Sequence, residues 1–371
     1  MASQAKIPQA TLLDKLLLIP NIGRIIFSLF FRLITYPIRT GPKAPTAYKD
    51  ALYGAIRTNL SICSPAQEQL LNKPTEVNYK VICKEAGISP ESDVLDGGKG
   101  QQFKVHWFGS KRGADKIVYY LHGGGYVLSA SLGHLRWLQE LQRDLSKGTG
   151  RRVSIAMPAY TLAPHGEYPQ QLREAVKGLD FVMNTLGYKP QDIILAADSA
   201  GGNLALSLLG HLLHPHPDPS ISPLNLSTPL AGTILISPWT KFAAGEDKSV
   251  LNTGSDMVSP ACSDRWSKLF MGSARLDNYN QPILTAGTDW WKGLPRVSGD
   301  VLVWGGGGEL LHDSIQAMTK ILKEQVGSEG RVELVIQPGV AHEDFIMEKL
   351  IGVTEKAEGT RLVEGWVSAR L

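Results

Sequence analysis

Cysteine is scarce in this sequence, and so is net charge. The three cysteines, Cys63, Cys83 and Cys262, lie far apart and form no CxxC pair. This spacing argues against a zinc site and a disulfide framework, and it favours a reducing compartment. The formal net charge is only +3, and Lys and Arg are spread among Asp and Glu, so we expect no nucleic-acid partner. The sequence also has no internal repeat and no low-complexity tract.

The N-terminal segment lacks the run of roughly 20 apolar residues that a bilayer-spanning helix needs, because a proline and two arginines interrupt residues 16–38. The segment is not followed by a clear cleavage site of small residues, which a signal peptide would require. At helical spacing Arg24, Ser28, Arg32 and Thr35 share one stripe, and most apolar residues lie away from it. This pattern predicts an amphipathic helix that packs on its own domain, lies on a membrane or covers a pocket.

The rest of the composition is that of a folded domain. At 371 residues with 43% hydrophobic content, the chain can bury one large core, and α/β domains of this length often stay single. Apolar strand-like runs alternate with helical patterns such as 170–186 and 313–326. The alternation predicts an α/β fold with a mainly parallel, twisted sheet covered on both faces. The expected strands are 103–108, 117–121, 153–157, 193–197, 232–237, 301–304 and 332–336.

A glycine-rich motif follows the expected strand at 117–121. It reads His122-Gly123-Gly124-Gly125-Tyr126, and consecutive glycines let backbone N–H groups turn toward a ligand, where a Cβ would obstruct them. Such N–H groups can hold a developing oxyanion.

A second motif, Asp198-Ser199-Ala200-Gly201-Gly202, follows the expected strand at 193–197 and runs into an apolar segment at 203–209. Ser199 is thus predicted on a sharp strand-to-helix turn with its hydroxyl pushed outward, as in a nucleophile elbow. Glu309 and then His342 follow the ends of later strands. The order Ser, acid, His is typical of one class of hydrolase, and the carboxyl ends of strands are where such sheets bind ligands.

From about residue 116 to the C-terminus the chain resembles the hormone-sensitive-lipase-like branch of the α/β-hydrolase fold, which includes arylacetamide deacetylases, bacterial carboxylesterases and fungal steryl acetyl hydrolase-like proteins. The residues that match are 122–125, Tyr160-Thr161-Leu162-Ala163-Pro164 with Tyr168-Pro169, Glu309-Leu310-Leu311-His312-Asp313, and Ala341-His342-Glu343-Asp344-Phe345. The segment 289–294 is similar to fungal members and suggests a fungal source.

The sequence departs from the pattern of this branch at three positions. Ala197 replaces the Gly that usually opens the elbow, Glu309 replaces a commoner Asp, and Lys241 stands where an acidic residue often follows a Ser-Pro-Trp run. Only Ala197 touches the nucleophile directly. Its extra methyl group needs no positive φ, so we expect it to be tolerated.

The resemblance implies a role for each residue of the site. Ser199 would be the nucleophile, neutral His342 its base, and Glu309 the acid that orients His342. Asp313 is the alternative acid, but it lies one helical turn further on, where we expect it to cap a helix or face solvent. The oxyanion donors would be the backbone N–H groups of Gly123, Gly124 and Ala200. No cofactor and no metal are implied.

Other polar residues have structural interpretations. We expect His122 to hold the glycine loop and Asp198 to be structural, and Tyr126 either borders the pocket or packs as a core aromatic. The alternating histidines of 214–219 lie in a proline-rich loop, which stiffens the chain without forming a ligand cage. Four other histidines lie in segments predicted as helix or loop, without the combination of an acidic residue and a strand end around them. They are His134, His165, His211 and His312.

The predicted domain organisation is an N-terminal helix with a cap or leader region over residues 1–99, followed by a catalytic domain over 100–371. An excursion at about 241–293 is the expected lid insertion, and its aromatics either line an apolar pocket or pack in the core. For the N-terminal helix we favour the lid over a membrane contact, because a hydrolase pocket of this branch needs a cap. The oligomeric state stays open.

We therefore expect a serine hydrolase that cleaves carboxylic esters of apolar small molecules through an acyl-enzyme, by analogy in fungal secondary-metabolite or sterol ester metabolism. The alternatives are an amidase or lactonase, a condensation or cyclisation enzyme on the same triad, and a ligand-binding receptor on a hydrolase scaffold. The expected location is the cytoplasm or, peripherally, a membrane such as the endoplasmic reticulum.

Overall fold

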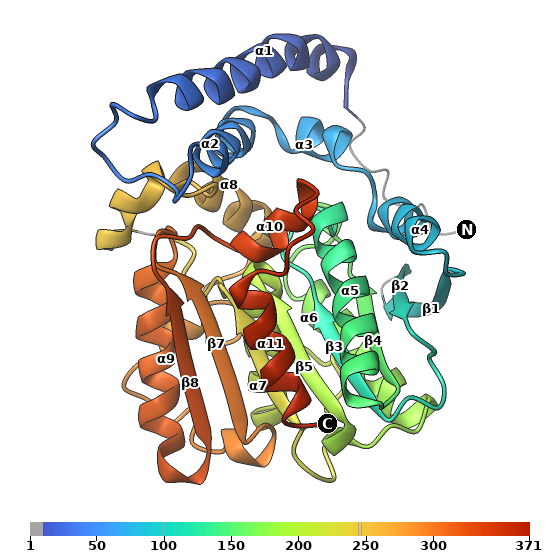
Figure 1. Cartoon of the computed structure of the whole chain (residues 1–371). Helices are drawn as coiled ribbons and strands as arrows, with labels where there is room; N and C mark the ends of the chain where they lie inside the picture. The colour runs from blue at the N-terminus through green and yellow to red at the C-terminus, as the bar shows by residue number, and fades with distance from the viewer. Residues whose placement is uncertain (1–9, 99, 244, 246) are drawn as a thin grey trace.

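The computed structural model describes residues 10–98, 100–243, 245 and 247–371 of the chain. Its centre is one eight-stranded sheet in the order β1-β2-β4-β3-β5-β6-β7-β8, with helices on both faces (Figure 1). This architecture confirms the predicted fold class. The strands are β1 (Glu91–Gly98), β2 (Gln101–Phe108), β3 (Lys116–Leu121), β4 (Val153–Ala159), β5 (Ile193–Asp198), β6 (Gly232–Ile236), β7 (Asp300–Gly306) and β8 (Arg331–Gln337).

Strands β3 to β8 run parallel, whereas β1 and β2 form an antiparallel hairpin at one edge of the sheet. All seven predicted strands are present, but the sequence does not predict β1. Its residues Glu91–Gly98 alternate between half-buried and exposed for most of their length, and a polar edge strand gives a weak sequence signal. The hairpin also crosses the division predicted at residue 99, so the sheet begins in the region that the sequence assigns to a cap or leader.

Two hydrophobic cores lie on opposite faces of the sheet, because successive residues of a strand point to opposite sides. In β3, Ile117 and Tyr119 belong to one core, and Val118 and Tyr120 belong to the other. The helices that cover the first core are α6 (Gln170–Asp180), α7 (Ser199–Leu213) and α9 (His312–Val326). Helix α6 continues as a π-helical turn over Phe181–Thr185. The helices that cover the second core are α4 (Thr75–Ala86), α5 (Leu132–Thr149), α10 (Asp344–Leu350) and α11 (Glu358–Ser368).

A cap lies over the carboxyl ends of the parallel strands and comes from two distant segments of the chain. Its N-terminal part is α2 (Ala47–Ile62) with α3 (Pro65–Leu71), and its second part is α8 (Pro260–Met271) from the predicted lid insertion. Buried Glu68 joins the two parts, because it accepts hydrogen bonds from Arg265 and, at 3.1 Å, from Trp266 Nε1.

Helix α1 (Leu12–Thr35) lies outside this cap, along α2 and α3 (Figure 1). It continues through Pro20, and it is long and apolar enough to cross a membrane, although the sequence pattern argues against a spanning helix. Only Asn21 of this helix is buried. Its large apolar residues are mostly exposed, and only Leu18, Ile25 and Leu29 among them are half-buried, whereas a surface helix usually buries its apolar face.

Candidate active site

Ser199 stands at the junction of β5 and α7, where the chain turns sharply. Its φ is +48°, a left-handed conformation that residues with a side chain seldom adopt and that is typical of functional positions. The turn depends on close packing, since a Cβ on Gly201 would collide with the carbonyl oxygen of Leu121. The predicted strand-to-helix turn at Ser199 is thus present, and Ala197 lies fully buried in β5 without disturbing it.

Ser199, His342 and Glu309 form one hydrogen-bonded chain, although they are far apart in the sequence. The Ser199 hydroxyl lies 2.8 Å from His342 Nε2, and His342 Nδ1 lies 2.6 Å from Glu309 Oε2. The other carboxylate oxygen of Glu309 accepts hydrogen bonds from the Gly306 N–H at 2.6 Å and the Ser237 hydroxyl at 3.0 Å. Glu309 is fully buried, so these bonds fix the orientation of its carboxylate toward the ring.

Asp256, which the sequence does not predict, braces the two loops that carry the acid and the histidine. Its carboxylate accepts the backbone N–H of Leu310 at 2.7 Å and that of His342 at 3.1 Å. Burial and the charge of Glu309 raise the pKa of Asp256, although His342 and the two backbone donors oppose that change. No sequence motif marks this residue, because its partners are backbone groups of distant loops.

One of the predicted oxyanion donors in the glycine loop already has a hydrogen-bond partner within the protein. The Gly123 N–H donates to Asp198 Oδ2 at 2.8 Å and is therefore already engaged. Gly124 and Gly125 have φ values of +102° and +60°, and both line the pocket beside Ser199. Gly124 and Gly125 thus border the pocket, whereas the N–H of Gly123 is bonded to Asp198. Ala200 follows Ser199 directly and is the second residue of α7.

His134 belongs to the site, although its sequence context does not predict this. Its Nε2 lies 3.0 Å from Asp198 Oδ2 and 3.6 Å from Glu343 Oε2, and Tyr120 donates its hydroxyl hydrogen to Asp198. Burial disfavours ionisation of Asp198, but the charge and hydrogen bond of His134 outweigh it and lower the pKa of Asp198. Asp198 is structural, as predicted, since Tyr120, Gly123 and His134 all bind it.

Glu343 follows His342 directly and brings another carboxylate to the ring. It has φ +51°, it is buried, and its Oε1 lies 3.4 Å from His342 Nε2. Burial and the charge of Asp198 raise the pKa of Glu343. Burial disfavours the His342 imidazolium, but the carboxylates of Glu343 and Glu309 outweigh burial and raise the pKa of His342 well above its ordinary value. The charge of His342 acts on Glu343 in turn and lowers its pKa, although burial outweighs this effect.

His134, Asp198 and Glu343 also bring ligand atoms within 4.8 Å of one another, a spacing that suits a metal ion. Asp198, however, already accepts hydrogen bonds from Tyr120, His134 and the Gly123 N–H. Its oxygens are therefore occupied by protein donors, and the cluster is explained as a hydrogen-bonded network.

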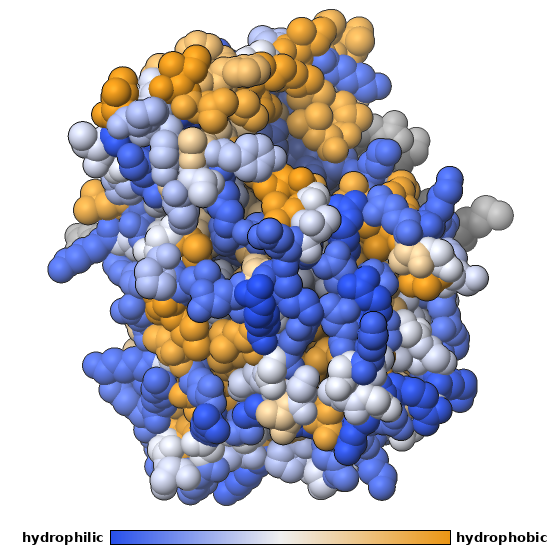
Figure 2. Space-filling model, in the orientation of Figure 1, coloured by the Kyte–Doolittle hydropathy of each residue, from blue (hydrophilic) through white to orange (hydrophobic). Residues whose placement is uncertain are grey.

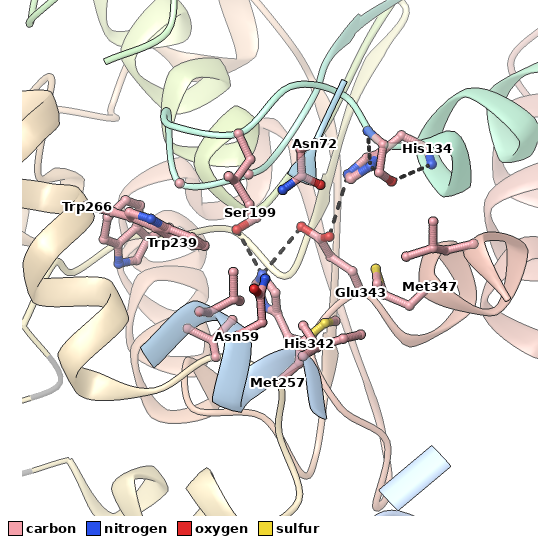
Figure 3. A pocket seen from close by; sticks show the side chains of 18 of the residues that line it. Asn59, Asn72, His134, Ser199, Trp239, Met257, Trp266, His342, Glu343 and Met347 are labelled. Carbon is pink, nitrogen blue, oxygen red and sulfur yellow. Dashed lines mark hydrogen bonds and ion pairs between the residues drawn. The ribbon is translucent and has the colours of Figure 1, made fainter. Parts of the chain in front are cut away.

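A cavity of about 180 Å³ opens beside Ser199 and is lined mainly by apolar side chains. Figure 3 shows Trp239 and Trp266 on one side of Ser199 and Met347 on the other, beyond Glu343. The lining comes from both parts of the cap, from the glycine loop and from α10, while no described residue of α1 takes part. The lid expected of the N-terminal helix is thus supplied by α2, which contributes Ile56, Asn59 and Leu60.

The remaining predicted positions lie at the edge of the site or outside it. Asp313 accepts the backbone N–H of Ser249 at 3.0 Å and makes no contact with His342. His122 stacks on Tyr160, and its Nδ1 lies 2.8 Å from the carbonyl oxygen of Gly123, so it holds the glycine loop as expected. Tyr126 is fully buried and stacks on Phe270 of α8.

Comparison with known proteins identifies a matching family and similar sequences. A family model described as alpha/beta hydrolase fold matches residues 118–346. Esterase LipU of Mycobacterium tuberculosis is 30% identical over 62% of this chain and 71% of its own length. An esterase of Gibberella moniliformis is 29% identical over 46% of this chain, and Steryl acetyl hydrolase 1 of Saccharomyces cerevisiae is 26% identical over 58%. The chain spans only 55% and 50% of the lengths of those two relatives.

Solved structures share the fold at lower identity. An esterase of the bacterial hormone-sensitive lipase family superposes with a TM-score of 0.65 and 20% identity, covering 88% of this chain and 99% of its own. Carboxyl esterase 2 of the fungus Tuber melanosporum gives a TM-score of 0.60 at 18% identity, covering 76% of this chain and 88% of its own.

Proposed function

We propose that this chain, which belongs to the α/β-hydrolase fold family, is a serine hydrolase that cleaves carboxylic esters of apolar small molecules. The observation that carries the proposal is the chain of hydrogen bonds from Ser199 through His342 to Glu309, at 2.8 and 2.6 Å. An unperturbed serine hydroxyl is a poor nucleophile at neutral pH, and a base at this distance is what activates it. Relatives named esterase and acetyl-hydrolase support the same reaction class.

In the proposed mechanism His342 Nε2 takes the Ser199 proton while Ser199 Oγ attacks the ester carbonyl carbon, and the carbonyl electron pair moves onto oxygen. When this intermediate collapses, the leaving alcohol takes the proton from His342 and an acyl-Ser199 ester is left. Water then attacks the acyl-enzyme by the same route and releases the carboxylic acid. Glu309 accepts the N–H of His342 Nδ1 throughout, which fixes the tautomer and stabilises the imidazolium.

The oxyanion would be held by backbone N–H groups beside the Ser199 hydroxyl. Because Gly123 donates to Asp198, we assign this role to Gly124 and Gly125, together with Ala200. Gly125 cannot carry a side chain, since a Cβ there would collide with the ring of Trp266. Donors that are fixed by packing need no reorganisation when charge develops on the substrate oxygen.

The substrate class follows from the walls of the cavity. Trp239, Trp266, Met257 and Val258 give an apolar lining around Ser199, which favours an apolar ester over a highly charged one. One relative is named as a steryl acetyl hydrolase, so we propose sterol or secondary-metabolite acetates as the first natural substrates to test. The hydrolysis of these esters should be compared with the hydrolysis of anilides and lactones, because an amidase or lactonase can use the same three side chains.

The decisive experiment is labelling with a fluorophosphonate probe, followed by mass-spectrometric mapping of the modified residue. We expect one modified residue, Ser199, and no labelling of Ser199→Ala. Ser207→Ala is the matched control, because Ser207 is also a buried serine of α7 but does not line the cavity. Labelling that persists in Ser199→Ala would assign the nucleophile elsewhere. Absence of labelling in the parent protein would favour a binding protein on a hydrolase scaffold.

A further inference from the structure

Helix α1 presents its polar side to the protein and its apolar side outward. The residues that face the domain include Asp14, Asn21, Ser28 and Arg32, each of which has a hydrogen-bond partner there. The outward face exposes large apolar side chains, among which Leu12, Ile19, Phe27 and Ile34 are between 67% and 76% exposed. A contiguous apolar face of this kind is uncommon on a soluble monomer and marks a surface that is covered in use.

The helix is fixed to the domain along its whole length. At its start Asp14 Oδ1 accepts the Ser64 hydroxyl hydrogen at 3.1 Å, and in the middle the Asn21 amide donates to Gln67 at 3.2 Å. Near its end Arg32 donates to both carboxylate oxygens of Asp50, at 2.9 and 3.1 Å. A helix that stood across a bilayer would lose these contacts, so this helix lies parallel to the surface that it meets.

The charges on α1 match an anionic surface. With 3.6 residues per turn, Lys15 and Arg24 fall on the two opposite edges of the apolar face, and both are exposed. The only acidic residue of the helix, Asp14, is turned inward to Ser64. Cations at the edges of an apolar helix face suit an interfacial helix, whose apolar residues enter the acyl region while Lys and Arg reach the headgroups.

We propose that the outward face of α1 docks in the plane of an anionic phospholipid bilayer. Figure 2 shows apolar residues gathered along the top of the molecule, over α1. Helix α2 lies between this face and the cavity, because it bonds α1 through Asp50 and Gly54 and lines the cavity with Ile56 and Leu60. A docked molecule would therefore hold its pocket within one helix layer of the lipid, where apolar esters concentrate.

The first test measures co-sedimentation of the full chain with vesicles of phosphatidylcholine containing phosphatidylserine. We expect binding that weakens as salt is added, and at least a tenfold loss of binding in the double variant Phe27→Asp/Phe30→Asp, with kcat/KM on a short soluble ester unchanged. Val94→Asp/Leu276→Asp is the matched control, because it also places two negative charges on exposed apolar positions, both outside α1. Equal binding of the parent and the double variant would overturn the proposal.

A second test separates docking in the plane from insertion across the bilayer. The hydroxyls of Ser28 and Thr58 lie 2.9 Å apart, so Ser28→Cys/Thr58→Cys can tether α1 to α2 by a disulfide. Docking in the plane predicts equal vesicle binding by the oxidised and reduced forms. Loss of binding on oxidation would show that α1 must leave the domain, which contradicts the proposal.

A third test asks whether a second copy of the chain covers the same face. Light scattering without lipid is expected to give a mass that Phe27→Asp/Phe30→Asp leaves unchanged. A dimer that this variant dissociates, together with no vesicle binding by the parent, would assign the face to self-association and overturn the lipid proposal.

Discussion

Glu343 Oε1 lies 3.4 Å from His342 Nε2, the same nitrogen that lies 2.8 Å from the Ser199 hydroxyl. The ring thus has Glu309 on its Nδ1 side and a second carboxylate beside the nitrogen that must accept the serine proton. This second carboxylate stabilises the imidazolium, so the form of His342 that can act as a base is reached only at higher pH. The same interaction would stabilise the charge that His342 acquires during acyl transfer.

The first prediction concerns this pair. In Glu343→Gln the negative charge near His342 Nε2 is lost, the pKa of His342 falls, and the acidic limb of the kcat/KM profile moves down by about 1 to 3 pH units. Activity is lost as pH falls through this limb, because His342 becomes protonated. Glu348→Gln is the control, since Glu348 pairs with Lys49 and does not line the cavity. If the acidic limb of the Glu343→Gln profile lies at the parental pH, Glu343 carries no charge when His342 titrates.

The second prediction concerns the nucleophile. Ser199→Ala should lower kcat by roughly 10⁶, because the acyl-enzyme route is removed, while circular dichroism and the melting temperature change little. Ser207→Ala should keep parental turnover. The assignment of Ser199 would be lost if its alanine variant kept a tenth of the parental rate after purification from a host without a background esterase.

The third prediction ranks two candidate acids. Glu309→Gln should cost about 10³ to 10⁴ in kcat with little change in KM, because an amide can hold His342 in the wrong tautomer. Asp313→Asn should cost far less, since Asp313 bonds the Ser249 backbone N–H and not the ring. Steady-state kinetics on one ester decides between them, and the reverse ranking would move the acid to Asp313.

The fourth prediction concerns Asp256, which holds the acid and histidine loops together. Asp256→Ala leaves the N–H groups of Leu310 and His342 buried without their acceptor. We expect a loss on the order of 3 kcal/mol in the free energy of unfolding and a fall in kcat of up to about 10² from displacement of the ring. Thermal denaturation and kinetics of the same sample measure both effects. Asp264→Ala, at an exposed position paired with Lys268, should change neither.

The parts of the site that the sequence predicts depend on local patterns. The turn at Ser199 follows from glycine spacing at a strand end, and the sheet follows from apolar runs, so both can be read without knowledge of tertiary contacts. The proximity of Ser199, His342 and Glu309 can be predicted from the sequence, because parallel strands bring their carboxyl ends to one edge of the sheet. Its geometry agrees with the expected roles, which the kinetic experiments test.

The parts that the sequence does not predict depend on contacts between distant residues. The pairing of His134 with Asp198 joins α5 to the end of β5, and no spacing rule connects these positions. Asp198 in turn binds the N–H of Gly123, one of the predicted oxyanion donors. The orientation of α1 was missed for a similar reason, since a polar stripe is normally assigned to solvent, whereas here Arg32 binds buried Asp50.

Asp50 also limits how the protein can be shortened. Its side chain is fully buried, and its carboxylate is bonded by Arg32 and Arg39, both of which precede residue 40. Removing the first forty residues would strip both cations from a buried anion inside α2, the helix that walls the cavity, and an uncompensated buried charge is strongly destabilising. Loss of activity on truncation would then report a damaged cavity wall rather than a lost anchor. Exchange of outward apolar residues of α1 for polar ones keeps both arginines, so it changes the exposed face without damaging the cavity wall.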